Sequence, residues 1–96
     1  MSSRTPIECV DVATDSSAAD ADREDAIEAL KLAHECDELA ALVREENLEA
    51  QFRRRALDSL GTPQCDSMLR DLVEKASLGP DLQSRAKDLL DGSNNR

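Results

Sequence analysis

Apolar residues recur at helical spacing along most of the chain, and their pattern nearly repeats after 30 residues. Residues 39–60, moved by 30 positions onto residues 69–90, give eight identities in 22 positions, most of them apolar. Phe52 falls on Leu82, which keeps an apolar match. A period of about 20–50 residues is typical of stacked supersecondary units, which usually build binding surfaces. The pattern predicts two helical hairpins related by an internal repeat and favours an interaction module over an enzyme.

Turn residues divide the second half of the chain into predicted helices. Apolar residues recur at four-residue steps over residues 48–60, the pattern of an amphipathic helix, and Gly61 is expected to stop it. Thr62-Pro63 predicts the next helix start, with threonine as the cap and proline in the first turn. Gly79-Pro80 predicts a further turn and restart, and Gly92 the end of the last helix.

The first half leaves two alternatives open. A helix is expected to begin near Asp20 or Asp22, since either side chain can cap exposed amides. It either runs to about Glu46 or breaks near residues 34–37, where Asp37 would cap a new helix.

The predicted organisation is a flexible acidic arm over residues 1–19, a helical domain over 20–92 and a tail over 93–96. Within the arm, the alternating residues 7–12 suggest a short extended piece that docks on the body. The domain is expected to be all-α, with four or five short antiparallel helices.

Composition supports the all-α prediction. The 96 residues include one aromatic side chain, Phe52, and no Trp or Tyr, and Leu and Ala greatly outnumber Val and Ile. This balance disfavours a sheet and favours helices. A chain of this length makes one small domain with a modest core.

The charge is unevenly distributed. Residues 1–46 carry 13 acids and 4 bases, a net of −9, whereas residues 47–96 carry 8 of each and account for none of the net charge of −9. A large negative charge repels phosphate backbones and acidic membrane surfaces. We therefore expect no nucleic-acid partner and no membrane partner.

No apolar run approaches the roughly 20 residues of a transmembrane helix, and the first ten residues lack the apolar stretch of a signal peptide. A cytoplasmic location is expected. The three cysteines, Cys9, Cys36 and Cys65, have no paired spacing and are predicted to be free thiols in a reducing compartment. Cys36 and Cys65 fall on apolar stripes and are interpreted as small core residues.

Each repeating unit has the form L-x-x-L-V, a turn, and R-A-x-D-x-L. These residues are Leu39, Leu42, Val43, Arg55, Ala56, Asp58 and Leu60, and again Leu69, Leu72, Val73, Arg85, Ala86, Asp88 and Leu90. The pattern resembles a HEAT or armadillo-type helical repeat over about half of the chain. This resemblance implies a scaffold or adaptor. The chain departs from that family in having only about two units and in lacking the usual proline at the first turn, so a compact bundle is the rival.

His34 is the only histidine, and a phosphotransfer domain would place one histidine on a helix of a small bundle. Such domains resemble His followed by x-Lys-Gly, whereas Glu35, Cys36 and Asp37 follow here, and these carboxylates would repel phosphate. His34, Cys36 and Cys65 also fail as a zinc site, because residues two apart on a helix point nearly opposite ways and no fourth ligand is evident. No metal, cofactor or catalytic residue is predicted.

The sequence thus predicts a small acidic module, an adaptor or an inhibitor-type regulator, that binds a partner protein through a helical face. Leu48, Phe52, Arg53 and Arg54 are the residues expected to border that face. Two alternatives remain: a self-associating bundle, such as a homodimer in which the leucine stripes are shared between chains, and phosphotransfer through His34.

Overall fold

The computed structural model describes residues 5–94, and all of its regular structure is helical, which confirms the all-α prediction. Within these residues there are six α-helices, where four or five were expected. They are α1 (Pro6–Thr14), α2 (Asp20–Leu32), α3 (Cys36–Arg44), α4 (Ala50–Ser59), α5 (Asp66–Lys75) and α6 (Pro80–Asn94), and a short 3₁₀ turn, η1 (Pro63–Cys65), precedes α5.

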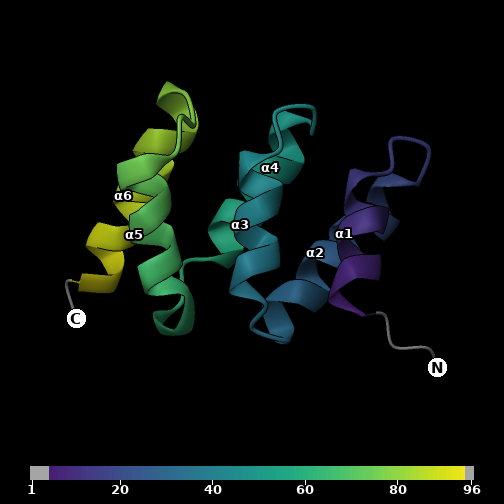
Figure 1. Cartoon of the computed structure of the whole chain (residues 1–96), viewed down its shortest axis with the longest axis horizontal. Coiled ribbons are helices and arrows are strands. Elements are labelled where there is room, and N and C mark those ends of the chain that lie inside the picture. The colour runs from purple at the N-terminus through teal and green to yellow at the C-terminus, as the bar shows by residue number, and fades with distance from the viewer. Residues whose placement is uncertain (1–4, 95–96) are drawn as a thin grey trace.

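Consecutive helices pair into three hairpins, α1–α2, α3–α4 and α5–α6. Figure 1 shows the hairpins side by side in chain order, with the first and third hairpins at opposite ends. Helices α1, α3 and α5 form one layer and α2, α4 and α6 the other, because each helix also packs on the corresponding helix of the next hairpin. The molecule measures 38 × 25 × 19 Å.

Helix α1 lies in the segment that was expected to be a flexible arm with a short extended piece. It begins with a capping box: the Thr5 hydroxyl accepts from the Glu8 amide at 3.2 Å, and the Glu8 carboxylate accepts from the Thr5 amide at 2.8 Å. Pro6 occupies the first turn, where its missing N–H costs nothing. Cys9 and Ala13 are buried against the rest of the chain, so α1 completes a first hairpin.

The chain breaks between α2 and α3, as in the second of the two alternatives, but Asp37 does not cap the new helix, because α3 begins at Cys36 with Glu35 as the N-cap and no capping side chain. The amide of Glu35 donates to the Leu30 carbonyl at 2.9 Å, and the amide of His34 donates to the Lys31 carbonyl at 3.1 Å. These two bonds make a Schellman motif, which requires a left-handed residue, and His34 has φ 57°. Ala33 and Glu35 complete the turn.

Three smaller predictions about helix ends are wrong. Helix α2 begins at Asp20 with Ala19 as the N-cap, so no aspartate side chain caps it, and Thr62 makes no capping bond before Pro63. Helix α6 continues past Gly92 to Asn94, into the predicted tail, of which residues 95–96 lie outside the described residues.

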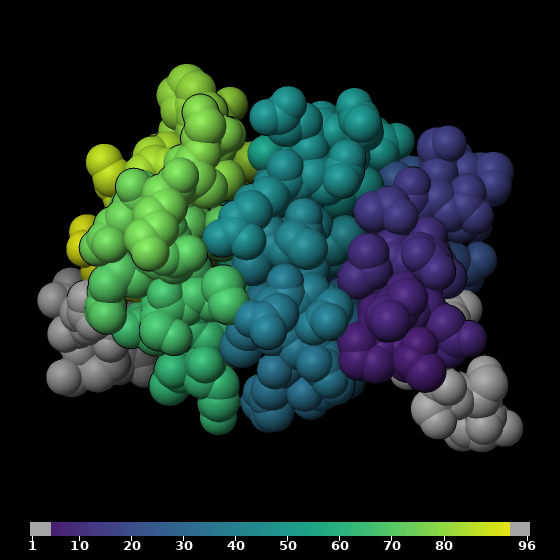
Figure 2. Space-filling model, viewed as in Figure 1, coloured from purple at the N-terminus to yellow at the C-terminus, as the bar shows by residue number. Residues whose placement is uncertain are grey.

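The apolar stripes of the six helices meet in one continuous core, and Figure 2 shows the three hairpins as consecutive blocks in close contact. Leu48 and Leu78, which follow corresponding turns, are 5% and 6% exposed. Among the described residues, the large apolar side chains left exposed are Ile7 and Leu32. The largest fully buried side chains are Phe52, Ile27, Leu30, Leu39, Leu42, Leu57, Leu60, Leu69, Leu72, Val43 and Cys65.

One hydrogen bond occurs in every hairpin, at positions 30 residues apart. Arg23 Nε donates to the Ala13 carbonyl at 3.0 Å, and Arg53 Nε donates to the Val43 carbonyl at 2.9 Å. In the third hairpin, Gln83 Nε2 donates to the Val73 carbonyl at 2.8 Å. Each bond ties the second helix of its hairpin to the last turn of the first helix, where carbonyls lack helical partners.

Among residues 5–94, none of the helices combines the length and the apolar character that crossing a bilayer requires.

Candidate functional site

The four residues predicted to border a binding face have different positions in the structure. Leu48 and Phe52 are 5% and 1% exposed, so they belong to the core and are not available to a partner. Arg53 is half-buried and uses its Nε to fasten α4 to α3. Arg54 alone is exposed. Leu48 and Phe52 continue the apolar stripe of the buried Ala56 and Leu60, and the guanidinium of Arg23 lies over the Phe52 ring.

Arg54 lies between two grooves on the layer formed by α2, α4 and α6. The first groove, between α2 and α4, has a volume of about 330 Å³, and the second, between α4 and α6, about 570 Å³. Gln51 and Arg54 line both grooves. The first groove is completed by Glu28, Lys31, Arg55, Asp58 and Ser59, and the second by Ala50, Asp81, Leu82, Ser84, Arg85 and Asp88.

Ion pairs link the helices on either side of these grooves. Arg85 Nε donates to an oxygen of Asp58 at 2.8 Å, joining α6 to α4, and this contact raises the pKa of Arg85. Arg55 lies 3.9 Å from the Glu24 carboxylate of α2. The recurrence of Arg55 at Arg85 suggests a pairing with Asp58 or Asp88, and in the structure it is Arg85 that pairs with Asp58. These exposed pairs contribute little stability, but they hold the positions of the groove walls.

The side chain of Arg54 has no ion pair and no hydrogen bond to any other described residue. A guanidinium group offers five N–H donors in a planar fork that matches a carboxylate in bidentate geometry. Gln51, one turn earlier on α4, adds an amide that can both donate and accept. The ridge between the grooves therefore presents a carboxylate-binding group next to a group suited to a peptide backbone.

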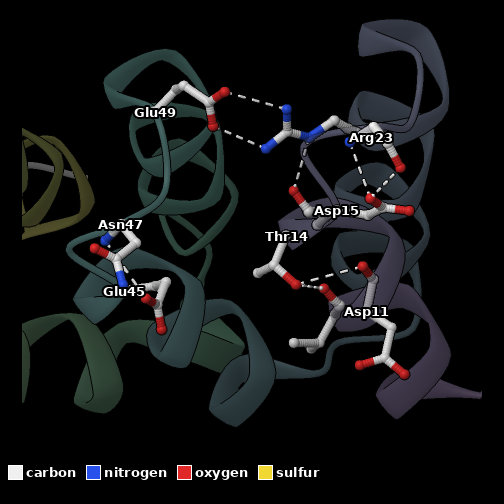
Figure 3. Close-up of polar contacts among 10 residues, drawn as sticks. Asp11, Thr14, Asp15, Arg23, Glu45, Asn47 and Glu49 are labelled. Carbon is white, nitrogen blue, oxygen red and sulfur yellow. Dashed lines mark hydrogen bonds and ion pairs between the residues drawn. The ribbon is translucent and has the colours of Figure 1, made fainter.

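A second arginine, Arg23, is buried where the first and second hairpins meet, and its side chain is 3% exposed. Its guanidinium contacts both oxygens of Glu49, at 2.8 and 3.3 Å, and lies 4.1 Å from the centre of the Phe52 ring. Figure 3 shows the side chain of Arg23 extending from the first hairpin towards Glu49. Hydrogen bonds from Arg23 lower the pKa of the Glu49 carboxyl. This group is satisfied within the chain, so its role is to join two hairpins.

The prediction of free thiols is wrong for two cysteines, because Cys36 and Cys65 form a disulfide. Their Cα atoms are 5.4 Å apart, and the bond joins the start of α3 to the residue before α5. The helix break at residues 33–35 and the turn η1 bring the two residues together, and neither feature is visible in cysteine spacing. The buried Cys9 lies in the first hairpin and is not part of this disulfide.

His34 is exposed in the turn between α2 and α3, and its left-handed backbone is its evident structural contribution. Cys36 and Cys65, which were not expected to bind zinc, are bonded to each other in the disulfide. The grooves were missed by sequence reasoning, since they depend on how α2, α4 and α6 pack. Arg54, one of the four residues predicted to border a binding face, is the residue of that set that lies between them.

No protein-family model, curated protein or solved structure matches this chain.

Proposed function

We propose that this protein is an interaction module, an adaptor or inhibitor-type regulator, which binds a carboxylate-bearing segment of a partner protein across the α2–α4–α6 face. The observation that carries the proposal is Arg54, an exposed arginine between two grooves with no ion-pair partner among the described residues. A carboxylate of the partner would accept two parallel hydrogen bonds from its guanidinium group.

The shape of the site favours an extended segment over a small molecule. Both grooves are open and shallow, and their shared lining residues, Gln51 and Arg54, lie on the ridge of α4. A peptide crossing this ridge would place an acidic side chain at Arg54 and a backbone amide at Gln51. On the far side of the second groove, the exposed Ser84 would meet a flanking position through its hydroxyl group.

The charge distribution supports an acidic segment at this place. The protein as a whole carries −9, whereas the lining of the two grooves combines the bases Lys31, Arg54, Arg55 and Arg85 with the acids Glu28, Asp58, Asp81 and Asp88 and is neutral. Of the bases, Arg55 and Arg85 are held by carboxylates of the chain itself. Lys31 and Arg54 are therefore the bases of this face that remain for an acidic side chain of the partner, which favours one register of binding.

We further propose that the three hairpins are three copies of one unit, which extends the two copies inferred from the sequence. The hydrogen bonds of Arg23, Arg53 and Gln83 support this interpretation, because they recur every 30 residues. Three units would also provide the number that a stacked array usually needs. On this proposal the HEAT-like or armadillo-like resemblance extends to the first hairpin. A cytoplasmic location remains a prediction.

The test is selection of peptides from a random displayed library on the immobilised wild-type protein. We expect the selected peptides to share an Asp or Glu, and Arg54→Glu to weaken their affinity roughly tenfold or more, because a charge-assisted bidentate contact becomes a repulsion. The matched control is Arg70→Glu, the same charge reversal on α5 at an exposed arginine paired with Asp66. Selected peptides without a carboxylate, or equal losses in both variants, would refute the proposal.

Self-association remains the alternative, and light scattering behind a sizing column distinguishes it. The apolar stripes that would have to be shared between chains are covered within one chain, apart from the isolated Ile7 and Leu32. We therefore expect a mass of one chain at micromolar concentration. A stable dimer would favour the alternative.

A further inference from the structure

The second and third hairpins are joined by a covalent bond that is partly accessible. Cys36, the first residue of α3, is half-buried, and Cys65, directly before α5, is 2% exposed. At the opposite end of α3, in the same layer, Arg44 pairs with Asp71 of α5 at 3.3 Å. That ion pair is exposed and contributes little stability. Of the polar and covalent links between α3 and α5 in the described residues, the disulfide is therefore the strong one.

We propose that the Cys36–Cys65 disulfide is a reversible redox clip that sets the position of the third hairpin and so the width of the groove between α4 and α6. This inference rests on the proposed function where it concerns partner binding, and on the structure alone where it concerns the groove. The clip lies in the layer of α1, α3 and α5, whereas the groove lies in the opposite layer. When the bond between α3 and α5 is broken, the third hairpin (α5–α6) can rotate about the link between α4 and η1. This rotation moves α6 relative to α4 and so changes the width of the groove between them.

The segment around Cys65 is suited to move when the bond is broken. Two buried polar atoms, Thr62 Oγ1 and Asp66 Oδ1, have no hydrogen-bond partner among the described residues, and they flank Cys65 in the chain. A buried polar atom without a partner costs free energy that is recovered when it reaches water. The oxidised arrangement of η1 is therefore held in place by the clip against a local cost.

The accessible sulfur determines how the clip opens. A thiolate of a dithiol reductant attacks Cys36 Sγ, the disulfide bond breaks, and Cys65 leaves as a thiolate that then takes a proton. Cys65 is the N-cap of α5, where the positive end of the helix dipole stabilises this thiolate, and the neighbouring Asp66 carboxylate is paired with Arg70 at 3.1 Å. The second thiol of the reductant attacks the mixed disulfide and releases Cys36. Two electrons have passed to the protein, and the reductant has become a disulfide.

The first groove is expected to be insensitive to the same reaction. It lies between α2 and α4, and those hairpins are joined by Arg23 through Glu49 and Phe52, which contain no sulfur. Opening the clip should therefore change one groove and leave the other in place. This difference separates a clip that acts on one joint from a bond that only adds stability to the whole chain.

The first experiment compares oxidised and dithiothreitol-reduced full-length protein, with alkylation and mass spectrometry to confirm each state. We expect amide hydrogen exchange over residues 66–92 to become at least tenfold faster on reduction and exchange over residues 20–32 to stay unchanged. Backbone NMR shifts of Gln51 and Ser84 should move, and those of Glu28 and Lys31 should not. Cys36→Ser should match the reduced protein with or without reductant, and Cys9→Ala should keep the redox response.

Three results would overturn the clip. These are a native protein that dithiothreitol does not reduce, exchange that accelerates equally in all three hairpins, and unchanged shifts at Gln51 and Ser84. The second experiment measures the affinity of an Arg54-dependent peptide in both redox states, and a change of at least fivefold is expected. An equal affinity would overturn control of binding while leaving the proposed function intact. Arg54→Glu with unchanged affinity would instead remove the proposed function, and the exchange and NMR results would still decide the clip.

Discussion

The joint between the first and second hairpins differs in chemistry from the joint between the second and third, although the helices around both pack alike. At the first joint, the buried Arg23 contacts Glu49 and the Phe52 ring. At the second joint, Leu82 takes the place of Phe52 after 30 residues, Gly79 takes the place of Glu49, and a disulfide links α3 to α5. The first joint has a buried charge over an aromatic face, and the second has a covalent bond beside two exposed ion pairs, Arg44–Asp71 and Arg85–Asp58.

The linkers differ in the same way. Between α2 and α3 the chain turns through the left-handed His34. Between α4 and η1 it passes through Gly61, where a Cβ atom would come within 3.1 Å of Leu89 on α6. Gly61 was expected to stop a helix, but its structural importance is this close approach. The comparison teaches that equivalent positions in similar hairpins can be stabilised by unrelated interactions, with different sensitivity to acid and to reductant.

The largest expected effect is that of Arg23→Ala, which would break the first joint. The substitution removes a cation–π contact, leaves the Ala13 carbonyl without its donor and opens a cavity, so we expect unfolding to become easier by on the order of 4 kcal/mol. Urea denaturation measures this loss. The matched control, Arg53→Ala, removes the corresponding bond to Val43 from a half-buried arginine and should cost about 1–2 kcal/mol. Equal losses of unfolding free energy in the two variants would mean that the contacts of Arg23 at the first joint are no stronger than the bond of Arg53 to Val43.

Breaking the second joint by reduction or by Cys36→Ser is expected to cost about 3.5 kcal/mol, since the bond closes a loop between residues 29 positions apart. The stabilisation comes mainly from restricting the unfolded chain. Denaturation of the oxidised and reduced protein in parallel measures it. A loss below about 1 kcal/mol would show that the second joint is held by apolar packing alone.

Acid should weaken the first joint selectively. The pKa of Glu49 is lowered by hydrogen bonds from Arg23, so this contact stabilises the fold above the ordinary value of 4.5 and is lost as the pH falls through the lowered value. Glu49→Gln should therefore flatten the decline of stability below pH 4.5, measured by urea denaturation at a series of pH values. Glu46→Gln, an exposed carboxylate in the same loop with no ion pair among the described residues, should leave the decline unchanged. A decline as steep in Glu49→Gln as in the wild type would contradict this assignment.

The smallest expected effect is a gain from His34→Gly in the linker of the first joint. A left-handed backbone costs a residue with a Cβ atom about 1–2 kcal/mol, part of which is offset by the greater freedom of glycine in the unfolded chain. The net stabilisation should be about 0.5 kcal/mol, read as a rise in thermal midpoint. His34→Ala keeps the Cβ atom and should show no gain. A loss in His34→Gly would mean that the imidazole itself is needed.

Local signals in the sequence explain both what was predicted and what was missed in the fold. The leucine stripes of α3 to α6 were predicted, because amphipathic spacing acts over a few residues, whereas the break near His34 was one of two alternatives that the sequence left open. Helix α1 was missed, although Thr5, Pro6 and Glu8 form a capping-box signature. The many Ser, Asp and Ala residues that follow in the arm outweighed that signal.

At the candidate site, one of four predicted residues is placed where a partner could reach it. Arg54 is exposed, whereas Arg53 of the same predicted set is half-buried. Leu48 and Phe52 were assigned to the surface although they belong to the core. Their burial depends on the angle at which one hairpin packs on the next, and no residue within either helix encodes that angle by itself.

The sequence by itself determined that the chain is all-helical, that its leucines form a core and that its net negative charge lies in the first half. These are properties of composition and short-range spacing. Only the tertiary structure decided that Arg23 meets Glu49, that Cys36 meets Cys65 and that Arg54 stands between two grooves. Each of these contacts joins residues 26 or more positions apart or depends on neighbouring helices. Such contacts form only when the packing of whole hairpins has brought their residues together.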